Sequence, residues 1–411
     1  MFKRWLCLSL LIHSTHSAAQ DYTFHGVLDF RATTAKTLPT YVDGGYGKFS
    51  SNDGTHLSVA QAGVEFTTDW QSGLTARLVA NAYSDETETI LGITEAFLKY
   101  RSIPNNTGYR WQIKAGIFYP EISLENNAYA WASKNTINSS AINTWIGEEI
   151  RLLGSELALT RLGKFNQSTY DITLAASAFV NNDTAGTLLS WHGWNIGNRQ
   201  TLWADSRPIP NFLARRPGNG LDQQAPRSKP FLEMDKKVGI HLRSQIKFHQ
   251  KGEISLGYYD NLATPYIVEN GQYVWRTRFN HLGFKWRLTN SLELSGQYLS
   301  GDTLMQSTSR VDVVNNNYTA AYLALSKKIK KHRLTVRLEE FSVTDNDQTL
   351  GDDNSEYGQS ATANYTYRFN KPWLLSLEYS VINSDRPSRS YTHMPVRLTE
   401  HQWQASARYF F

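Results

Sequence analysis

The sequence has one cysteine, Cys7, among its 411 residues. That cysteine falls within a stretch with the features of an export signal: a basic start, an apolar run over residues 5–12 and the small-residue cleavage sequence at residues 17–19. We therefore expect residues 1–19 to be a signal peptide. After residue 19 no cysteine is left, which excludes internal disulfides and thiol chemistry in the exported chain.

Long apolar runs and linkers are also missing. After residue 19 no apolar run approaches the ~20 residues of a membrane-spanning helix, and the mean hydropathy is -0.46. No proline- or serine-rich linker divides the chain, so we expect residues 20–411 to form a single domain. These absences exclude helical spans but not a transmembrane barrel. A barrel strand needs only about 10 residues, of which every second one faces lipid.

Aromatic residues, by contrast, are abundant. They make up 13% of the chain, with 22 tyrosines and 12 tryptophans, and such side chains favour the boundary between lipid and water. The formal net charge is only +5, so we expect no nucleic-acid partner. The composition therefore favours a membrane barrel.

Apolar residues alternate with polar or small ones in sixteen segments after residue 19. In the last segment, Trp403, Ala405 and Ala407 fall on one face, whereas Gln404 and Ser406 fall on the other. A period of two is typical of strands with two different faces. The predicted strands are residues 22–33, 57–68, 74–83, 93–101, 109–118, 150–161, 169–180, 235–247, 252–260, 277–288, 292–300, 317–327, 332–343, 359–369, 373–384 and 400–411.

Short and long connections alternate strictly between these segments. Seven short connections, such as residues 69–73 and 370–372, alternate with long ones, such as 34–56 and 119–149. Outer-membrane barrels have short periplasmic turns, long external loops and an even number of strands. The pattern therefore predicts an all-β, transmembrane antiparallel barrel of about sixteen strands.

The chain ends with Arg408, Tyr409, Phe410 and Phe411, and this aromatic end is similar to the assembly signal of outer-membrane proteins. A second segment, residues 116–125, is similar to the glycine- and phenylalanine-containing stretch that opens the third loop of several porins. With sixteen strands, the chain resembles the general porin superfamily of Gram-negative bacteria. The resemblance implies an outer-membrane channel for passive diffusion of small hydrophilic solutes, without a cofactor. It also implies contact with outer-membrane lipid and lipopolysaccharide, and a homotrimer.

The same resemblance implies that residues 119–149 fold into the lumen as a constriction loop. Loop carboxylates in porins face basic residues on the wall, which sets a transverse field. The loop carries one lysine, Lys134, and four acids: Glu121, Glu125, Glu148 and Glu149. The candidate basic residues of the wall are Arg77, Lys99, Arg110, Lys114 and Arg151.

Basic residues also outnumber acids at the inward positions assigned by the period of two. An excess of cations along a pore concentrates anions, so the channel is expected to prefer anions mildly. The alternative is that these side chains only keep the lumen wet and pair with one another.

Two further charged patterns fit ordinary turns and loops. The basic run at residues 327–333 spans a predicted periplasmic turn and fits a solvated turn better than a binding site. Asp345, Asp347 and Glu356 have the spacing of a calcium loop, but Leu350 replaces its glycine and strands flank it, so no metal is expected.

The longest loop, residues 181–234, either caps the pore and contacts a solute, adds a hairpin that makes eighteen strands, or packs on itself. It contains Trp191, Trp194, Trp203, Arg215 and Arg216. A capping role would suit a substrate-specific channel for a sugar, phosphate or other anion, which is the main alternative function. A barrel hydrolase is a weaker alternative, because no nucleophile motif is present.

Overall fold

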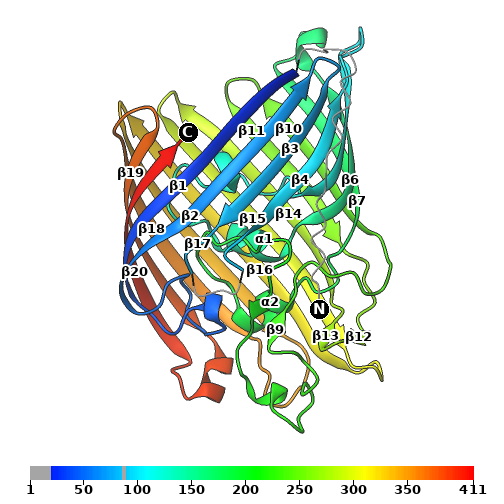
Figure 1. Cartoon of the computed structure of the whole chain (residues 1–411), viewed down its shortest axis with the longest axis vertical. Helices are drawn as coiled ribbons and strands as arrows, with labels where there is room; N and C mark the ends of the chain where they lie inside the picture. Colours follow the sequence, from blue (N-terminus) through cyan, green and yellow to red (C-terminus); the bar gives the residue numbers. More distant parts are fainter. Residues whose placement is uncertain (1–19, 86–88) are drawn as a thin grey trace, which may run out of the picture.

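The structure, a computed structural model, describes residues 20–85 and 89–411. The predicted signal peptide, residues 1–19, lies outside the described residues. Sixteen antiparallel strands form one closed barrel, which confirms the predicted fold class (Figure 1). They are β1 Gln20–Lys36, β2 Gly54–Trp70, β3 Leu74–Ala82, β4 Leu91–Arg101, β5 Tyr109–Phe118, β6 Leu152–Arg161, β7 Tyr170–Val180, β10 Gly239–Phe248, β11 Gly252–Asp260, β14 Arg276–Thr289, β15 Leu292–Gln306, β16 Asp312–Ile329, β17 His332–Asp345, β18 Glu356–Arg368, β19 Trp373–Asp385 and β20 Arg397–Phe410.

The ring closes where β1 pairs with β20. Val27 lies opposite Phe410, and Lys36 lies opposite His401. Just beyond this register, the backbones of Gly26 and Phe411 exchange hydrogen bonds of 3.0 and 3.2 Å. Every barrel strand therefore has two hydrogen-bonded neighbours, which is the condition for a sheet to lie in lipid without water.

The two faces of the wall follow the predicted alternation. On β17, Leu334, Val336 and Leu338 are exposed on the outside, whereas Thr335 and Arg337 are buried inside. On β20, Trp403 is exposed, while the glutamine and serine between the outward residues are buried. Exposed aromatic residues gather near the rim with the short turns, where lipid headgroups would lie. They include Tyr22, Phe24, Tyr100, Tyr109 and Trp111.

The two rims differ as predicted. The longer loops gather at the lower end of the barrel in Figure 1, opposite the short turns. The long loop predicted at residues 301–316 is wrong, because β15 and β16 extend further and only residues 307–311 connect them. Asn315, Asn316 and Asn317 favour turns, but here they pair with β15 along a continuous ladder. Pairing with a neighbouring strand outweighs their low strand propensity.

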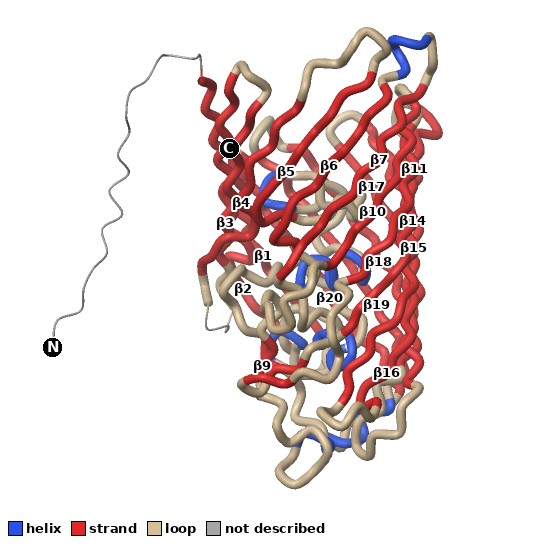
Figure 2. Tube along the Cα trace, turned by 90° about the vertical axis from the view of Figure 1, so that its right-hand side faces the viewer, coloured by secondary structure: helices blue, strands red, loops and turns tan. Residues whose placement is uncertain are grey.

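The interior of the barrel contains two short helices, α1 (Ala141–Glu149) and α2 (Thr187–His192). All residues of both helices are buried, and Figure 2 shows the helical segments between the walls. None of the described helices is long and apolar enough to cross a membrane. Short 3-10 turns occupy Tyr41–Asp43, Tyr129–Trp131, Gly163–Asn166, Leu213–Arg215 and Pro387–Thr392.

Two small hairpins lie in the loops. Strands β8 (Arg207–Pro208) and β9 (Arg227–Ser228) pair within the longest loop, and β12 (Val268–Glu269) pairs with β13 (Gln272–Tyr273). Neither hairpin joins the barrel. The described barrel therefore has sixteen strands, not the eighteen that the longest loop left open.

Candidate functional site

The loop between β5 and β6 folds into the lumen and ends in α1. Ser140 begins the helix, because its hydroxyl accepts a hydrogen bond of 3.3 Å from the backbone N–H of Asn143. Trp145 of α1 packs edge-on against two wall residues, Phe279 and Tyr318, with ring centroids 5.4 Å apart in both pairs. An apolar core therefore lies inside the barrel, where a wide pore would hold water.

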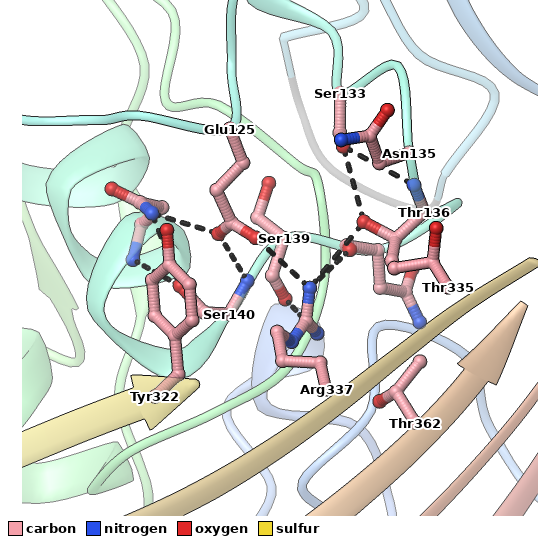
Figure 3. Close-up of polar contacts among 12 residues, drawn as sticks. Glu125, Ser133, Asn135, Thr136, Ser139, Ser140, Tyr322, Thr335, Arg337 and Thr362 are labelled. Atoms are coloured by element: carbon pink, nitrogen blue, oxygen red, sulfur yellow. Dashed lines mark hydrogen bonds and ion pairs between the residues drawn. The ribbon is translucent and has the colours of Figure 1, made fainter. Parts of the chain in front are cut away.

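A buried guanidinium clamps this loop to the wall on β17. The side chain of Arg337 is 0% exposed and lies 2.8 Å from Glu339 on its own strand and 3.0 Å from Glu125 of the loop. It also donates to the backbone carbonyls of Asn138 and Ser139, both at 3.0 Å (Figure 3). Charge and hydrogen bonds together satisfy the cation, so Arg337 fixes the loop in one position.

A second clamp joins the loop to β1 and β20. Arg408 donates to Asp29 at 2.8 Å, and also to three loop carbonyls, including that of Ile137 at 2.9 Å. On β19, the carboxylate of Glu378 accepts backbone N–H groups from Ile137 at 2.6 Å and Asn138 at 3.0 Å. Strands β17, β19, β20 and β1 follow one another closely around the ring, so one continuous arc of the wall holds the loop.

Glu121 is the loop acid that remains accessible, with 49% of its side chain exposed. It faces two inward cations, Arg243 at 2.6 Å and Lys114 at 3.8 Å. Lys114 also lies 3.2 Å from Glu156 on β6. This arrangement places a loop carboxylate opposite wall cations, and Arg243 belongs to it although it was not among the candidate site residues.

Three other predicted wall cations, Arg77, Lys99 and Arg110, also lie on the inner face of the barrel. Arg77 is half-buried and pairs with Glu65 at 3.0 Å and Glu95 at 3.5 Å. Lys99 lies beside Lys114 in the β4–β5 register, and Arg110 lies nearer the short-turn rim, opposite Thr160. These three cations lie on the inner wall at different depths, and Arg77 is already partnered.

Arg151 does not face an open passage. Its side chain is buried, with the guanidinium 4.4 Å from the ring centroid of Tyr119 and 4.7 Å from that of Phe231. It also donates to the backbone carbonyl of Thr201 at 2.7 Å. The period of two predicted its direction, but not the long loop that covers it.

Glu148 and Glu149 are likewise buried beneath the long loop. Glu149 accepts hydrogen bonds from the backbone N–H groups at the start of α2, including that of Leu188 at 2.9 Å, and from the Trp145 indole at 2.7 Å. Glu148 lies 3.3 Å from Arg207. Burial raises the pKa of each carboxyl to about 7. Both residues join the two loops and present no carboxylate to an open lumen.

The longest loop packs on itself and on the constriction loop. Trp191 and Trp194 are buried, with Trp194 edge-on to Trp145 at 5.8 Å, and the half-buried Trp203 stacks on Phe231 at 5.1 Å. Of the uses left open for this loop, packing on itself matches these contacts, and the buried Trp191 and Trp194 are not available to a solute. The two loops together form a plug, which we define as residues 119–151 and 181–238.

The acidic residues with calcium-loop spacing have other partners. Glu356, at the twelfth position, is buried and pairs with Lys48 and with Arg386. Asp345, at the first position, accepts the backbone N–H of Asn354 at 2.8 Å. These acidic residues therefore stabilise the packing of the loop between β17 and β18.

Solved structures resemble this fold closely in length and topology. The outer membrane channel DcaP of Acinetobacter baumannii matches 97% of this chain and 99% of its own, with 12% identity and a TM-score of 0.53. An anion-selective porin from Comamonas acidovorans matches 95% of this chain and 100% of its own, with 12% identity and a TM-score of 0.52. The trimer form of OmpT of Vibrio cholerae matches 96% and 100%, with 8% identity and a TM-score of 0.54.

No protein-family model and no curated protein sequence matches the chain. At these identities the similarity defines the fold. The chain is a porin-like β-barrel of the outer-membrane type, with sixteen strands and a loop folded into the lumen.

Proposed function

We propose that this protein is an outer-membrane porin that lets small hydrophilic solutes diffuse passively, with a mild preference for anions. The observation that carries the proposal is a closed barrel with an apolar outside and a charged inside, narrowed by an internal loop. Lys114 and Arg243 are balanced by Glu121 and Glu156. The excess of positive charge comes instead from inward cations that form no ion pair among the described residues, such as Lys99 and Arg110. Such an excess attracts anions into a narrow, low-dielectric passage.

The reversal potential across a planar bilayer under a potassium chloride gradient tests the selectivity. A potential of the sign set by chloride supports the anion preference, and a potential of the sign set by potassium rejects it. Channel insertion itself is tested by stepwise increases in current. A purified chain that inserts into the bilayer but never conducts contradicts the whole proposal.

A substrate-specific channel is a second candidate, and the plug favours it. Residues 181–238 and 119–151 share an aromatic core, so the passage is narrower than the barrel. Liposome swelling with sugars, amino acids and phosphate separates the two candidates. Rates that depend on solute size alone support a general porin, whereas sharp selectivity supports a specific channel.

The expected homotrimer is part of the same proposal. The trimer form of OmpT supports it by likeness of fold. An apolar groove on the outer wall, across β1, β2, β19 and β20, offers a surface for another barrel, and its lining includes Phe30, Leu57, Ala405 and Ala407. Crosslinking in detergent and in bilayers, followed by mass measurement, tests the oligomeric state.

A further inference from the structure

A cavity of about 520 Å³ lies at the end of the lumen where the short turns are. Its walls come from separate parts of the ring and from the plug: Glu65 of β2, Lys134 of the constriction loop, and Arg333 and Arg368 on the inner faces of β17 and β18. The volume is typical of small-molecule sites. The cavity therefore lies on the path that a solute would take between the plug and the rim with the short turns.

The charge of this cavity is strongly one-sided. Besides Lys134, Arg333 and Arg368, the turns contribute Lys328, Lys330, Lys331 and Lys371. The acid that lines the cavity, Glu65, is already paired with Arg77 at 3.0 Å. The basic run at residues 327–333 lies in an exposed turn, as interpreted from the sequence, and it also forms one wall of this half-open cationic space.

The cations of this cavity also differ from the inward cations that lie beside the plug. Arg337 and Arg408, beside the plug, each have a carboxylate within 3.0 Å. Among the described residues, Lys134, Arg333 and Arg368 have no carboxylate within ion-pair distance. Arg368 donates to the backbone carbonyl of Lys371 at 3.2 Å, and Arg333 to the side chain of Asn135.

The ammonium group of Lys134 lies close to other positive charges. Partial loss of solvent, together with the positive charges of Lys285, Arg333 and Arg368, lowers the pKa of the Lys134 ammonium below its ordinary value. Uncompensated like charges around a cavity raise the free energy of the empty site, and a multivalent anion would relieve it.

We propose that this cavity binds a soluble oxyanion with several phosphate groups on the periplasmic side of the plug. Several donors from separate elements converge there, and both guanidinium and ammonium groups bind phosphate oxygens. The site deepens the proposed function and rests on it only for its place on the solute path. Binding to the cavity does not require conduction.

Isothermal titration calorimetry of the full chain in neutral detergent, with inorganic triphosphate at low salt, tests the site. The test variant is Lys134→Gln with Arg368→Gln, since both side chains are exposed and neither clamps the plug. The matched control is Lys164→Gln with Lys251→Gln, which removes the same charge from other turns of the same rim. Lys164 and Lys251 do not line the cavity.

We expect saturable binding that is tighter for triphosphate than for orthophosphate. The test variant should weaken it by roughly tenfold or more, because two charge-assisted contacts are lost. The control should change it less than about twofold, as for distant screened charges. Absence of saturable binding, or equal weakening in both variants, overturns the proposal.

Two further measurements are needed. The first distinguishes a soluble anion from a lipid headgroup as the ligand, and the second tests anion binding independently of channel conductance. If nanodiscs containing phosphatidylglycerol abolish triphosphate binding that phosphatidylcholine nanodiscs allow, the ligand is a lipid headgroup and the soluble anion is rejected. Bilayer conductance is measured on the same preparations. Binding without any conductance upholds the site and contradicts the proposed channel, so the two failures remain distinct.

Discussion

Replacing Arg337 with methionine should release the constriction loop from the wall. The substitution keeps an apolar side chain of similar length but removes the cation between Glu125 and Glu339, at 3.0 and 2.8 Å. Breaking a buried ion pair by deleting one partner costs about 3–5 kcal/mol. At about 1.4 kcal/mol per factor of ten, the docking equilibrium of the loop shifts by roughly a hundred- to several-thousand-fold. Strand β17 itself keeps its ladders to β16 and β18.

The assay combines single-channel recording with limited proteolysis. The Arg337→Met variant should show larger, fluctuating conductance and new cleavage within residues 119–151, while the barrel stays intact. Arg278→Met is the matched control, because its pair with Asp302 at 2.8 Å is partly exposed and worth only about 0.2–1 kcal/mol. Wild-type conductance together with a wild-type cleavage pattern in Arg337→Met would refute the clamp.

Three other changes test the plug and the passage. Glu148 and Glu149 have pKa values raised to about 7, so the docked plug holds their protons more tightly than the released loops do. Its stability should therefore be full below about pH 4.5 and fall as the pH rises to about 7, seen as faster proteolysis. Glu149→Gln should flatten that profile, and an unchanged slope would contradict the assignment. Glu121→Gln removes the exposed loop carboxylate, so the reversal potential should shift toward chloride; an unchanged reversal potential would show that Glu121 lies off the ion path. Trp145→Ala should destabilise plug docking by about 3–5 kcal/mol, measured as protease sensitivity of residues 119–151, and sensitivity equal to wild type would exclude Trp145 from the plug core.

The barrel could be predicted from the sequence because its signal is local. Alternation on β17 and β20 follows from the period of two, and turn length follows from the spacing of the strands. Both strands of the β15–β16 hairpin were predicted, but their extension over residues 301–306 and 312–316 was missed, because Asn315, Asn316 and Asn317 have low intrinsic strand propensity. Their pairing with β15 depends on the neighbouring strand, which a local pattern does not contain.

The plug was largely beyond prediction for a related reason. Lys114 and Glu121 approach each other as the porin resemblance implies, but the burial of Glu148, Glu149 and Arg151 depends on where the long loop packs. Helices α1 and α2 are too short for their apolar pattern to reveal that packing. Arg207, the partner of Glu148, lies 59 positions along the chain, and no spacing rule connects them.

The pairing of β1 with β20 has a consequence for biogenesis. Val27 and Phe410 are neighbours at the seam although nearly the whole sequence separates them, so the cylinder cannot be sealed before the final hairpin arrives. Until then the growing sheet has two unpaired edge strands, and the wall does not yet surround the aromatic cluster at Trp145. Because the closed wall has no opening between its strands, the two internal loops enter the lumen either before β1 meets β20 or through the open rim to which they are attached.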